Sequence, residues 1–571
     1  MAADLILTNG KVYSITSDDC IIRADAVAVK NGKILETGSV NEIMKYADDE
    51  TEIVDCCGNT ILPGMCDAHC HPSIAMTAMN SADLFGAYRQ DGQSADDVID
   101  ILMERLREYV DEHPDDKVIR GTGWIFTVFN PNDRMPTRHD IDKVCADRPV
   151  ILESFCQHNL WVNTKAIEIA GVDASTPETS TGKIYREENG YPMGVFSEPE
   201  AMEYIKTGVP GYDLSIEEYK EGIRWYQREC ANKYGVTFVQ DCMHSDNARE
   251  AYRQMAEDGE LTIRLRGVYM LRPEMYEQDM KEFIARKGKD NVGNDFRIDT
   301  VKMFSEGTFN LTDGYLPEFC KEMGVGDDYN GKLHWSDEVF TEYAAKAMDA
   351  GFNVHVHAMG DGAVTQSAEC LAKAQHMTGK QPRNIIAHLM LTPDTVAELM
   401  GKEKIIANCQ PAWMMFEADV SDEIGMMGEE KARQSYPLRK FIDNNVTVAF
   451  GTDFPVTPPP DTMQEICVAM TRSITPGTTG YEQFKGQVLG NEKPATLSEA
   501  VKSLSINGAY QMFGEEYTGS IEKGKSAELV VLDSDIEATP AEEIYKIRIS
   551  KTFFKGNKVY DIADEQYAES L

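Results

Sequence analysis

The sequence has little positive charge. Its 571 residues include 56 Lys and Arg against 95 Asp and Glu, so the formal net charge is −39. Nucleic-acid surfaces need a basic patch, and anionic membranes attract basic segments, so we expect neither a nucleic acid nor a membrane as partner. An acidic chain of this kind is typical of a soluble protein of the cytosol.

The sequence also lacks the segments that direct a chain out of the cytosol. Residues 1–15 have no basic stretch before an apolar run and are predicted as strand, turn and strand rather than as a signal peptide. No apolar run is long enough to span a bilayer. The 13 cysteines follow no repeated spacing and include no CxxC pair, which excludes a zinc ribbon and predicts reduced thiols. We therefore expect a cytoplasmic protein.

Both ends of the chain have the pattern of short strands joined by tight turns. Asn9-Gly10 and Asn31-Gly32 each separate two alternating segments, and Asn-Gly is a strong hairpin signal. Residues 527–532 and 547–549 continue this pattern near the C-terminus. The sequence predicts one β-sandwich domain built from residues 1–63 and 515–571.

The middle of the chain alternates apolar strands with helical patterns. This alternation predicts a parallel sheet covered by helices, and the number of units favours an α/β fold with a (β/α)8 TIM-like barrel over residues 64–514. Residues 75–230 are too many for a loop, so we predict a helical insertion there. The strand candidates are 237–240, 300–304, 352–357, 384–388, 404–409 and 446–453.

Polar side chains recur on these apolar strands. His69 and His71 flank Cys70, and alternate residues of a strand share one face, so two imidazoles form half of a metal site. In a parallel barrel the carboxyl ends of the strands meet at one mouth. Taken singly, each residue has a simpler interpretation as a core histidine or a snorkelling lysine. The whole series is harder to obtain by chance: His69, His71, Lys302, His357, His388 and Asp453.

Lys302 lies within an apolar strand, where a lone cation is costly to bury. It needs a carboxylate partner or conversion to a carbamate by CO₂. His355 shares the strand face of His357, and we leave open whether it supports a metal ligand or packs in the barrel.

Several motifs together resemble the amidohydrolase superfamily, in the branch of large amidohydrolases that includes N-substituted formamide deformylases. The resemblance covers nearly the whole chain. The motifs that carry it are 64–71 (Gly-Met-Cys-Asp-Ala-His-Cys-His), 301–304, 355–361 (His-Val-His-Ala-Met-Gly-Asp), 383–388, 410–411 and 451–453, with 121–124 and 158–163 between them.

The resemblance implies a metal centre with ligands at His69, His71, Lys302, His357, His388 and Asp453, and with Lys302 carboxylated. Imidazole and carboxylate groups suit Zn²⁺, as one or two divalent ions. Asp453 is the predicted catalytic group, because it can take a proton from water and pass it to the leaving nitrogen.

Four further residues are predicted to line a substrate pocket: Trp124, His158, Glu306 and Trp413. His158 is also a candidate catalytic group that would hydrogen-bond the substrate carbonyl. Packing is an equal alternative for His158 and Trp413. Glu306-Gly307 stands where relatives often carry Asp-Gly, so the substrate cannot be transferred from them.

These observations predict a metal-dependent hydrolase of non-peptide C–N bonds in small-molecule amides. The alternative within enzymes is a deaminase of a cyclic amidine or aminated ring on the same scaffold. Deaminases of this superfamily generally lack the carboxylated lysine, so Lys302 favours the hydrolase. A catalytically inactive scaffold relative is the third interpretation, and all six filled ligand positions speak against it. The sequence leaves a homo-oligomer open.

Overall fold

The computed structural model describes residues 2–89, 92–129, 134–156, 158–179, 182–307 and 309–569. Contacts divide the chain into two units. The first comprises Met1–Pro72, Arg224–His244 and Tyr252–Leu571, and the second comprises Ser73–Ile223 and Ser245–Ala251. Among the described residues, no helix is long and apolar enough to cross a membrane.

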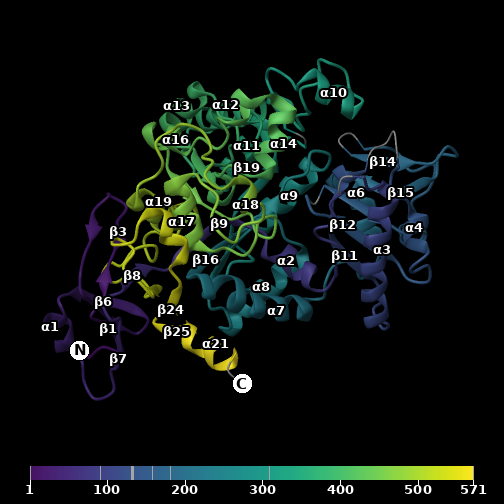
Figure 1. Ribbon diagram of the computed structural model, residues 1–571. Helices are drawn as coiled ribbons and strands as arrows, with labels where there is room; N and C mark the ends of the chain where they lie inside the picture. The colour runs from purple at the N-terminus through teal and green to yellow at the C-terminus, as the bar shows by residue number, and fades with distance from the viewer. Residues whose placement is uncertain are drawn as a thin grey trace. The chain divides into compact units, whose positions relative to one another are not determined.

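The first unit contains an eight-stranded parallel sheet whose strands follow one another in chain order. The amide of Asp453 donates to the carbonyl of His69 (2.8 Å) and that of His71 donates to the carbonyl of Phe454 (2.7 Å), which joins the first strand to the end of the last. The sheet is therefore a nearly closed barrel, which confirms the predicted fold class (Figure 1). Its strands are β9 (Met65–Cys70), β16 (Val236–Asp241), β17 (Arg264–Met270), β18 (Phe296–Phe304), β19 (Asn353–Ala358), β20 (Ile385–His388), β21 (Ile406–Cys409) and β22 (Val448–Phe450).

Helices separate the barrel strands along the chain. One of them is the helix Asp337–Asp349, which Ser336 caps by accepting from the amide of Val339. Outside residues 73–223, the helices between barrel strands are α8 (Asp246–Asp258), α9 (Tyr276–Arg286), α10 (Pro317–Met323), α11 (Asp337–Asp349), α12 (Asp361–Thr378), α13 (Asp394–Glu403), α14 (Ala418–Met427), α15 (Glu429–Ala432) and α16 (Leu438–Asp443). The helices that follow β22 include α17 (Thr462–Thr471), α18 (Tyr481–Phe484), α19 (Leu497–Leu504) and α20 (Ile506–Gln511).

Strand β17 was missing from the predicted strands. Arg264 and Arg266 are residues typical of an exposed segment, but both side chains are buried. Arg264 pairs with Glu528 (3.1 Å), and the Arg266 guanidinium donates to the carbonyl of Met512 (3.0 Å). Two arginines can be buried in this barrel strand because residues from the C-terminal part of the chain accept their hydrogen bonds.

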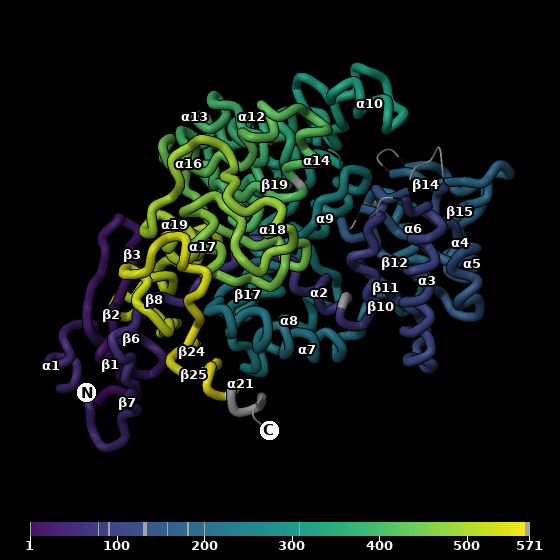
Figure 2. Tube along the Cα trace, viewed as in Figure 1, coloured from purple at the N-terminus to yellow at the C-terminus, as the bar shows by residue number. Residues whose placement is uncertain are grey.

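Both ends of the chain contribute to one β-structure, in which a five-stranded and a four-stranded sheet enclose apolar residues such as Leu7, Val27 and Leu529. Figure 2 shows the purple N-terminal and yellow C-terminal segments in this region. The boundaries 1–63 and 515–571 remain a prediction, because contacts place these strands in the same unit as the barrel. The first sheet contains β2 (Lys11–Val12), β8 (Thr60–Pro63), β23 (Leu529–Leu532), β24 (Ile549–Phe554) and β25 (Asn557–Asp561), and the second contains β1 (Leu5–Thr8), β5 (Ala26–Lys30), β6 (Lys33–Gly38) and β7 (Glu52–Asp55).

The second unit differs from the predicted helical insertion, because it has a six-stranded mixed sheet as well as helices. Ile151 packs in one apolar cluster and its neighbour Leu152 in another, so both faces of the sheet are covered. Its continuous apolar strands therefore lack the alternation that marks a strand. The strands are β10 (Ala82–Asp83), β11 (Ile119–Trp124), β12 (Val150–Ser154), β13 (Asn159–Val162), β14 (Lys183–Arg186) and β15 (Pro192–Ser197), and the helices are α2 (Pro72–Met79), α3 (Ala95–Glu112), α4 (Arg138–Asp142), α5 (Thr164–Ala170), α6 (Pro199–Gly208) and α7 (Ile216–Trp225).

Candidate metal centre

His69 and His71 converge on one carboxylate. His69 lies near the end of β9 and His71 just beyond it, and their ring centroids are 5.3 Å apart. Asp453 Oδ1 lies 2.9 Å from His71 Nε2 and 3.3 Å from His69 Nε2. A Cβ atom on Gly451 would come within 2.5 Å of the His69 amide, so a glycine is needed for this approach.

The other predicted ligands lie around the same point. Lys302 on β18 is fully buried, with Nζ 3.4 Å from His69 Nε2. The ring of His388 lies 4.8 Å from that of His69 and 4.5 Å from that of His357, measured between centroids. The structure thus brings together all six residues predicted as ligands.

Two of these residues have an unusual backbone conformation. The φ angle is 77° at His388 and 61° at Asp453, in the left-handed region that favours glycine. Such conformations cost roughly 1–3 kcal/mol each and collect at functional sites. The fold therefore holds these two side chains where the backbone alone would not place them.

The local electrostatics suit a bound cation. Burial lowers the pKa of His69 well below its ordinary value, and it lowers the pKa of His388 to about 4. Burial would raise the pKa of Asp453, but the hydrogen bond from His71 and the nearby cationic groups hold that pKa below its usual range. Neutral imidazoles beside an ionised carboxylate are the protonation states that metal ligands need.

The donor set fits a divalent metal. His69, His71 and Asp453 each offer one ligand atom, and these atoms lie within 4.8 Å of one another. In the part of the chain that the structure describes, the buried Nδ1 atom of His71 has no hydrogen-bond partner. Two imidazoles and a carboxylate are typical zinc ligands.

Three buried residues lie behind the predicted ligands, in contact with them directly or through one another. His355 Nε2 lies 2.9 Å from His69 Nδ1, and Cys242 Sγ lies 3.9 Å from His355 Nδ1. Cys242 was not predicted; its only sequence signal is its place just after strand β16. Gln410 Oε1 lies 3.0 Å from His388 Nδ1 and belongs to a motif noted in the sequence.

Trp413 and Glu306 have different surroundings. Trp413 is half-buried, and its ring stacks on His388 at a centroid distance of 5.3 Å. Glu306 is buried, and its carboxylate accepts from the backbone amides of Asn310, Met359 and Gly360. Glu306 therefore joins the loops that follow β18 and β19, and its predicted contact with a substrate remains a prediction.

Trp124 and His158 belong to the second unit. Trp124 is fully buried in an apolar cluster, and its Nε1 donates to the carbonyl of Leu152 (3.0 Å). Trp124 thus packs in the core of this unit, and its predicted substrate contact remains a prediction. His158 Nδ1 lies 3.0 Å from Glu198 Oε2. The predicted substrate contact of His158 stays a prediction.

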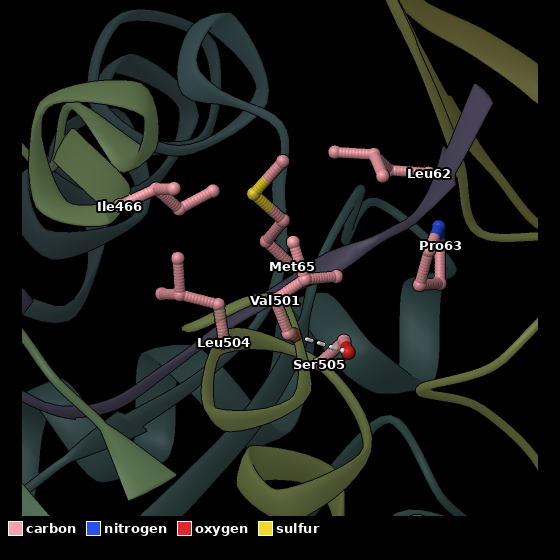
Figure 3. A pocket seen from close by; sticks show the side chains of 7 residues that line it. All are labelled: Leu62, Pro63, Met65, Ile466, Val501, Leu504 and Ser505. Atoms are coloured by element: carbon pink, nitrogen blue, oxygen red, sulfur yellow. Dashed lines mark hydrogen bonds between the residues drawn. The ribbon is translucent and has the colours of Figure 1, made fainter. Parts of the chain in front are cut away.

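A separate apolar cavity lies among β8, β9, α17 and α19 (Figure 3). Apolar side chains such as Met65 and Leu504 line it, and the hydroxyl of Ser505 already donates to the carbonyl of Val501 (2.6 Å). The lining offers nothing to orient a polar ligand, so we assign no site there.

Comparisons with known proteins agree with this geometry. The chain is 26% identical over 545 residues to YtcJ of Bacillus subtilis, covering 94% of this chain and 96% of that protein. It is 23% identical over 564 residues to the N-substituted formamide deformylase of Arthrobacter pascens, covering 98% of each. An uncharacterized metal-dependent hydrolase from Pyrococcus horikoshii has the same fold, with a TM-score of 0.70 and 22% identity over 94% of this chain and 99% of that one.

A family model described as the amidohydrolase family matches residues 52–560. The match spans most of the chain and agrees with the motifs from which the resemblance was predicted. The chain therefore belongs to the amidohydrolase family.

Proposed function

We propose that this protein hydrolyses an amide C–N bond, other than a peptide bond, in a small molecule. The observation that carries the proposal is the convergence of two imidazoles, a buried lysine and a carboxylate at the end of the barrel strands. Family membership supports a hydrolase, and one relative is named for the deformylation of N-substituted formamides.

We propose that His69, His71 and Asp453 hold Zn²⁺, and that Lys302, His357 and His388 complete a centre for one or two ions. An ion held there would lower the pKa of water towards ~7 and would polarise the scissile carbonyl. The residues of the chain supply orientation and proton transfer.

Asp453 is the proposed proton carrier. As the water oxygen bonds to the carbonyl carbon, Asp453 accepts the water proton, and it delivers that proton to the nitrogen as the C–N bond breaks. The products are a carboxylic acid and an amine. The position of Asp453 supports this role, because its Oδ1 lies 2.9 Å from His71 Nε2 and 3.3 Å from His69 Nε2, where the proposed ion and its water would be held.

We further propose that Lys302 carries a carboxylate group derived from CO₂. Burial lowers the pKa of Lys302, which favours the neutral amine. That amine bonds to the carbon of CO₂ and releases a proton, which leaves an anionic carbamate. An anion at this position suits a cation-binding site better than an ammonium group does.

The proposed test measures metal content and hydrolysis in the same preparation. Protein purified without chelators is analysed for metal per chain and then assayed against a panel of N-acyl and N-formyl amines. A matched panel of cyclic amidines and amino-substituted rings is assayed for ammonia release. We expect bound metal, and acid plus amine from the first panel.

A His69→Ala, His71→Ala double variant is the control. We expect it to fold, to lose bound metal and to lose turnover. Full metal occupancy in the double variant would overturn the ligand assignment. Ammonia release from the second panel alone would instead make the protein a deaminase, and metal without turnover in either panel would favour an inactive relative.

A further inference from the structure

A chain of hydrogen bonds runs from His388 into the barrel interior through three amide side chains. His388 Nδ1 lies 3.0 Å from Gln410 Oε1, and Gln410 Nε2 donates to Asn408 Oδ1 at 2.8 Å. Asn408 Nδ2 donates to Gln511 Oε1 at 3.1 Å, and Gln511 Nε2 donates to the backbone carbonyl of Ala68 at 2.6 Å. All three amide side chains are buried.

The far end of this chain determines the direction of every bond in it. A backbone carbonyl can only accept, so Gln511 must present its NH₂ group to Ala68 and its oxygen to Asn408. Asn408 must then donate to Gln511 and accept from Gln410, which must turn its own oxygen towards His388. Reversing any single amide would place two oxygens or two NH₂ groups against each other in a buried position.

A second bond from Gln511 agrees with this direction. Its Nε2 also donates to Gln240 Oε1 at 2.9 Å, so both hydrogens of that NH₂ group are used. Gln240 and Asn408 lie on barrel strands, and Gln511 ends α20. Contacts from three separate secondary-structure elements therefore determine the same direction for this series of hydrogen bonds.

We infer that Gln410, Asn408 and Gln511 fix the tautomer of His388, with the proton on Nδ1 and a free lone pair on Nε2. They are positioning residues, since they act through His388. An unrestrained neutral imidazole samples both tautomers, and only the one with an unprotonated Nε2 can bind a cation or accept a proton at that atom. The functional role of these hydrogen bonds rests on the proposed metal centre, whereas the inferred tautomer of His388 does not depend on it.

The test reads the tautomer directly in metal-free protein. Histidine labelled with ¹⁵N is incorporated, and the two ring nitrogens of His388 are identified by comparison with a His388→Gln variant. Long-range ¹H–¹⁵N correlation distinguishes a protonated from an unprotonated ring nitrogen. We expect a protonated Nδ1 and an unprotonated Nε2 at neutral pH.

Variants at Gln410 separate the hydrogen bond from packing. Gln410→Leu removes the acceptor, so we expect a mixture of tautomers and a metal affinity lower by about 10–100-fold. Gln410→Glu loses the donor to Asn408 Oδ1, but either of its oxygens can accept from His388 Nδ1, so the wild-type tautomer should persist. Asn408→Leu breaks the chain one step further away and should shift the tautomer in the same direction, which provides a second variant if Gln410→Leu does not fold.

Gln375→Leu is the matched control. Gln375 is also buried, accepts from Asn384 Nδ2 at 2.9 Å and donates to the carbonyl of Glu403 at 2.9 Å, but its bonds do not lead to His388. We expect this variant to leave the tautomer of His388 unchanged.

A proton on Nε2 in the wild type would overturn the inference, as would an unchanged tautomer in Gln410→Leu. A correct tautomer in a protein that binds no metal or hydrolyses no amide would overturn only the proposed function.

Discussion

His69 Nδ1 lies 2.9 Å from His355 Nε2, so one buried imidazole supports another. Metal-binding histidines usually donate their second N–H to a carboxylate, a backbone carbonyl or water. Here a neutral ring takes that place, and the Cys242 thiol lies beyond it, 3.6 Å from the carbonyl of Gln240. Of the two roles left open for His355 in the sequence, this contact favours support of a ligand.

Replacing His355 should therefore weaken metal binding without removing a ligand. We expect His355→Phe to lower metal affinity about 10–100-fold, because His69 loses the partner that orients its ring. His355→Gln can still accept from His69 Nδ1 and should retain more metal. Competition with a chelator measures both affinities, and equal affinities in the two variants would assign His355 to packing.

Lys302→Ala should lose activity and part of the bound metal, because the proposed carbamate would be a shared ligand. Wild-type protein equilibrated with ¹³C-bicarbonate should show a carbamate carbon signal that is missing from the variant. A wild type that is fully active and shows no such signal would refute the carboxylation and leave Lys302 as an amine.

Asp453→Asn keeps the shape of the side chain but cannot accept a proton. General acid–base groups typically contribute about 10²–10⁴-fold, so we expect kcat to fall by that amount or more. Most metal should be retained and KM should change less. Near-normal kcat would move the proton-transfer role to another group, with His158 and Glu306 as the next candidates.

Glu306→Gln should destabilise the fold. The NH₂ group of glutamine would face backbone amides that now donate to the carboxylate, and an unsatisfied buried group costs roughly 1–3 kcal/mol. Denaturant unfolding measures the loss, and Glu322→Gln at an exposed position is the control. Equal stability of the two variants would show that Glu306 does not hold the loops together.

His158 and Glu198 should give a pH-dependent contribution to stability. Burial opposes the charge of His158, but the hydrogen bond and charge of Glu198 outweigh it and raise the pKa of His158 to about 9. Because the folded pKa exceeds the unfolded value of 6.5, this contribution is fully present below pH 6.5 and is lost as the pH rises through 9.

NMR titration of His158 checks this prediction directly. Glu198→Gln should bring the pKa of His158 down and flatten the loss of unfolding free energy between pH 6.5 and 9. An unchanged titration in the variant would show that Glu198 is not the cause.

The apolar pattern of the sequence predicted most of the barrel strands. The strands that it did not predict were missed for two different reasons. Strand β17 was missed because arginines such as Arg264 and Arg266 usually indicate a solvent-exposed segment. Both can be buried because each has a partner in the fold, such as Glu528 for Arg264. The sheet of the second unit was missed for the opposite reason, because strands such as Val150–Ser154 are covered on both faces and lack alternation.

The predicted ligands came from side chains that look out of place on apolar strands, as Lys302 does. The groups that support them could not be found in this way. Gln511 lies in a helix after the last barrel strand, and its part in the site depends on contacts with Asn408 and Ala68. Trp124 differs from these groups, since a motif resemblance suggested a substrate contact and its side chain lies in an apolar cluster.

The hydrogen bonds that join the last barrel strand to the first have a consequence for how the protein is made. His71 and Asp453 are 382 residues apart, and the same two segments both close the barrel and carry predicted ligands. During synthesis His69 and His71 have no carboxylate partner until Asp453, late in the chain, has left the ribosome. An ion that binds only the completed barrel would then stabilise the folded state at the last step of folding. This stabilisation would increase with the free concentration of the ion.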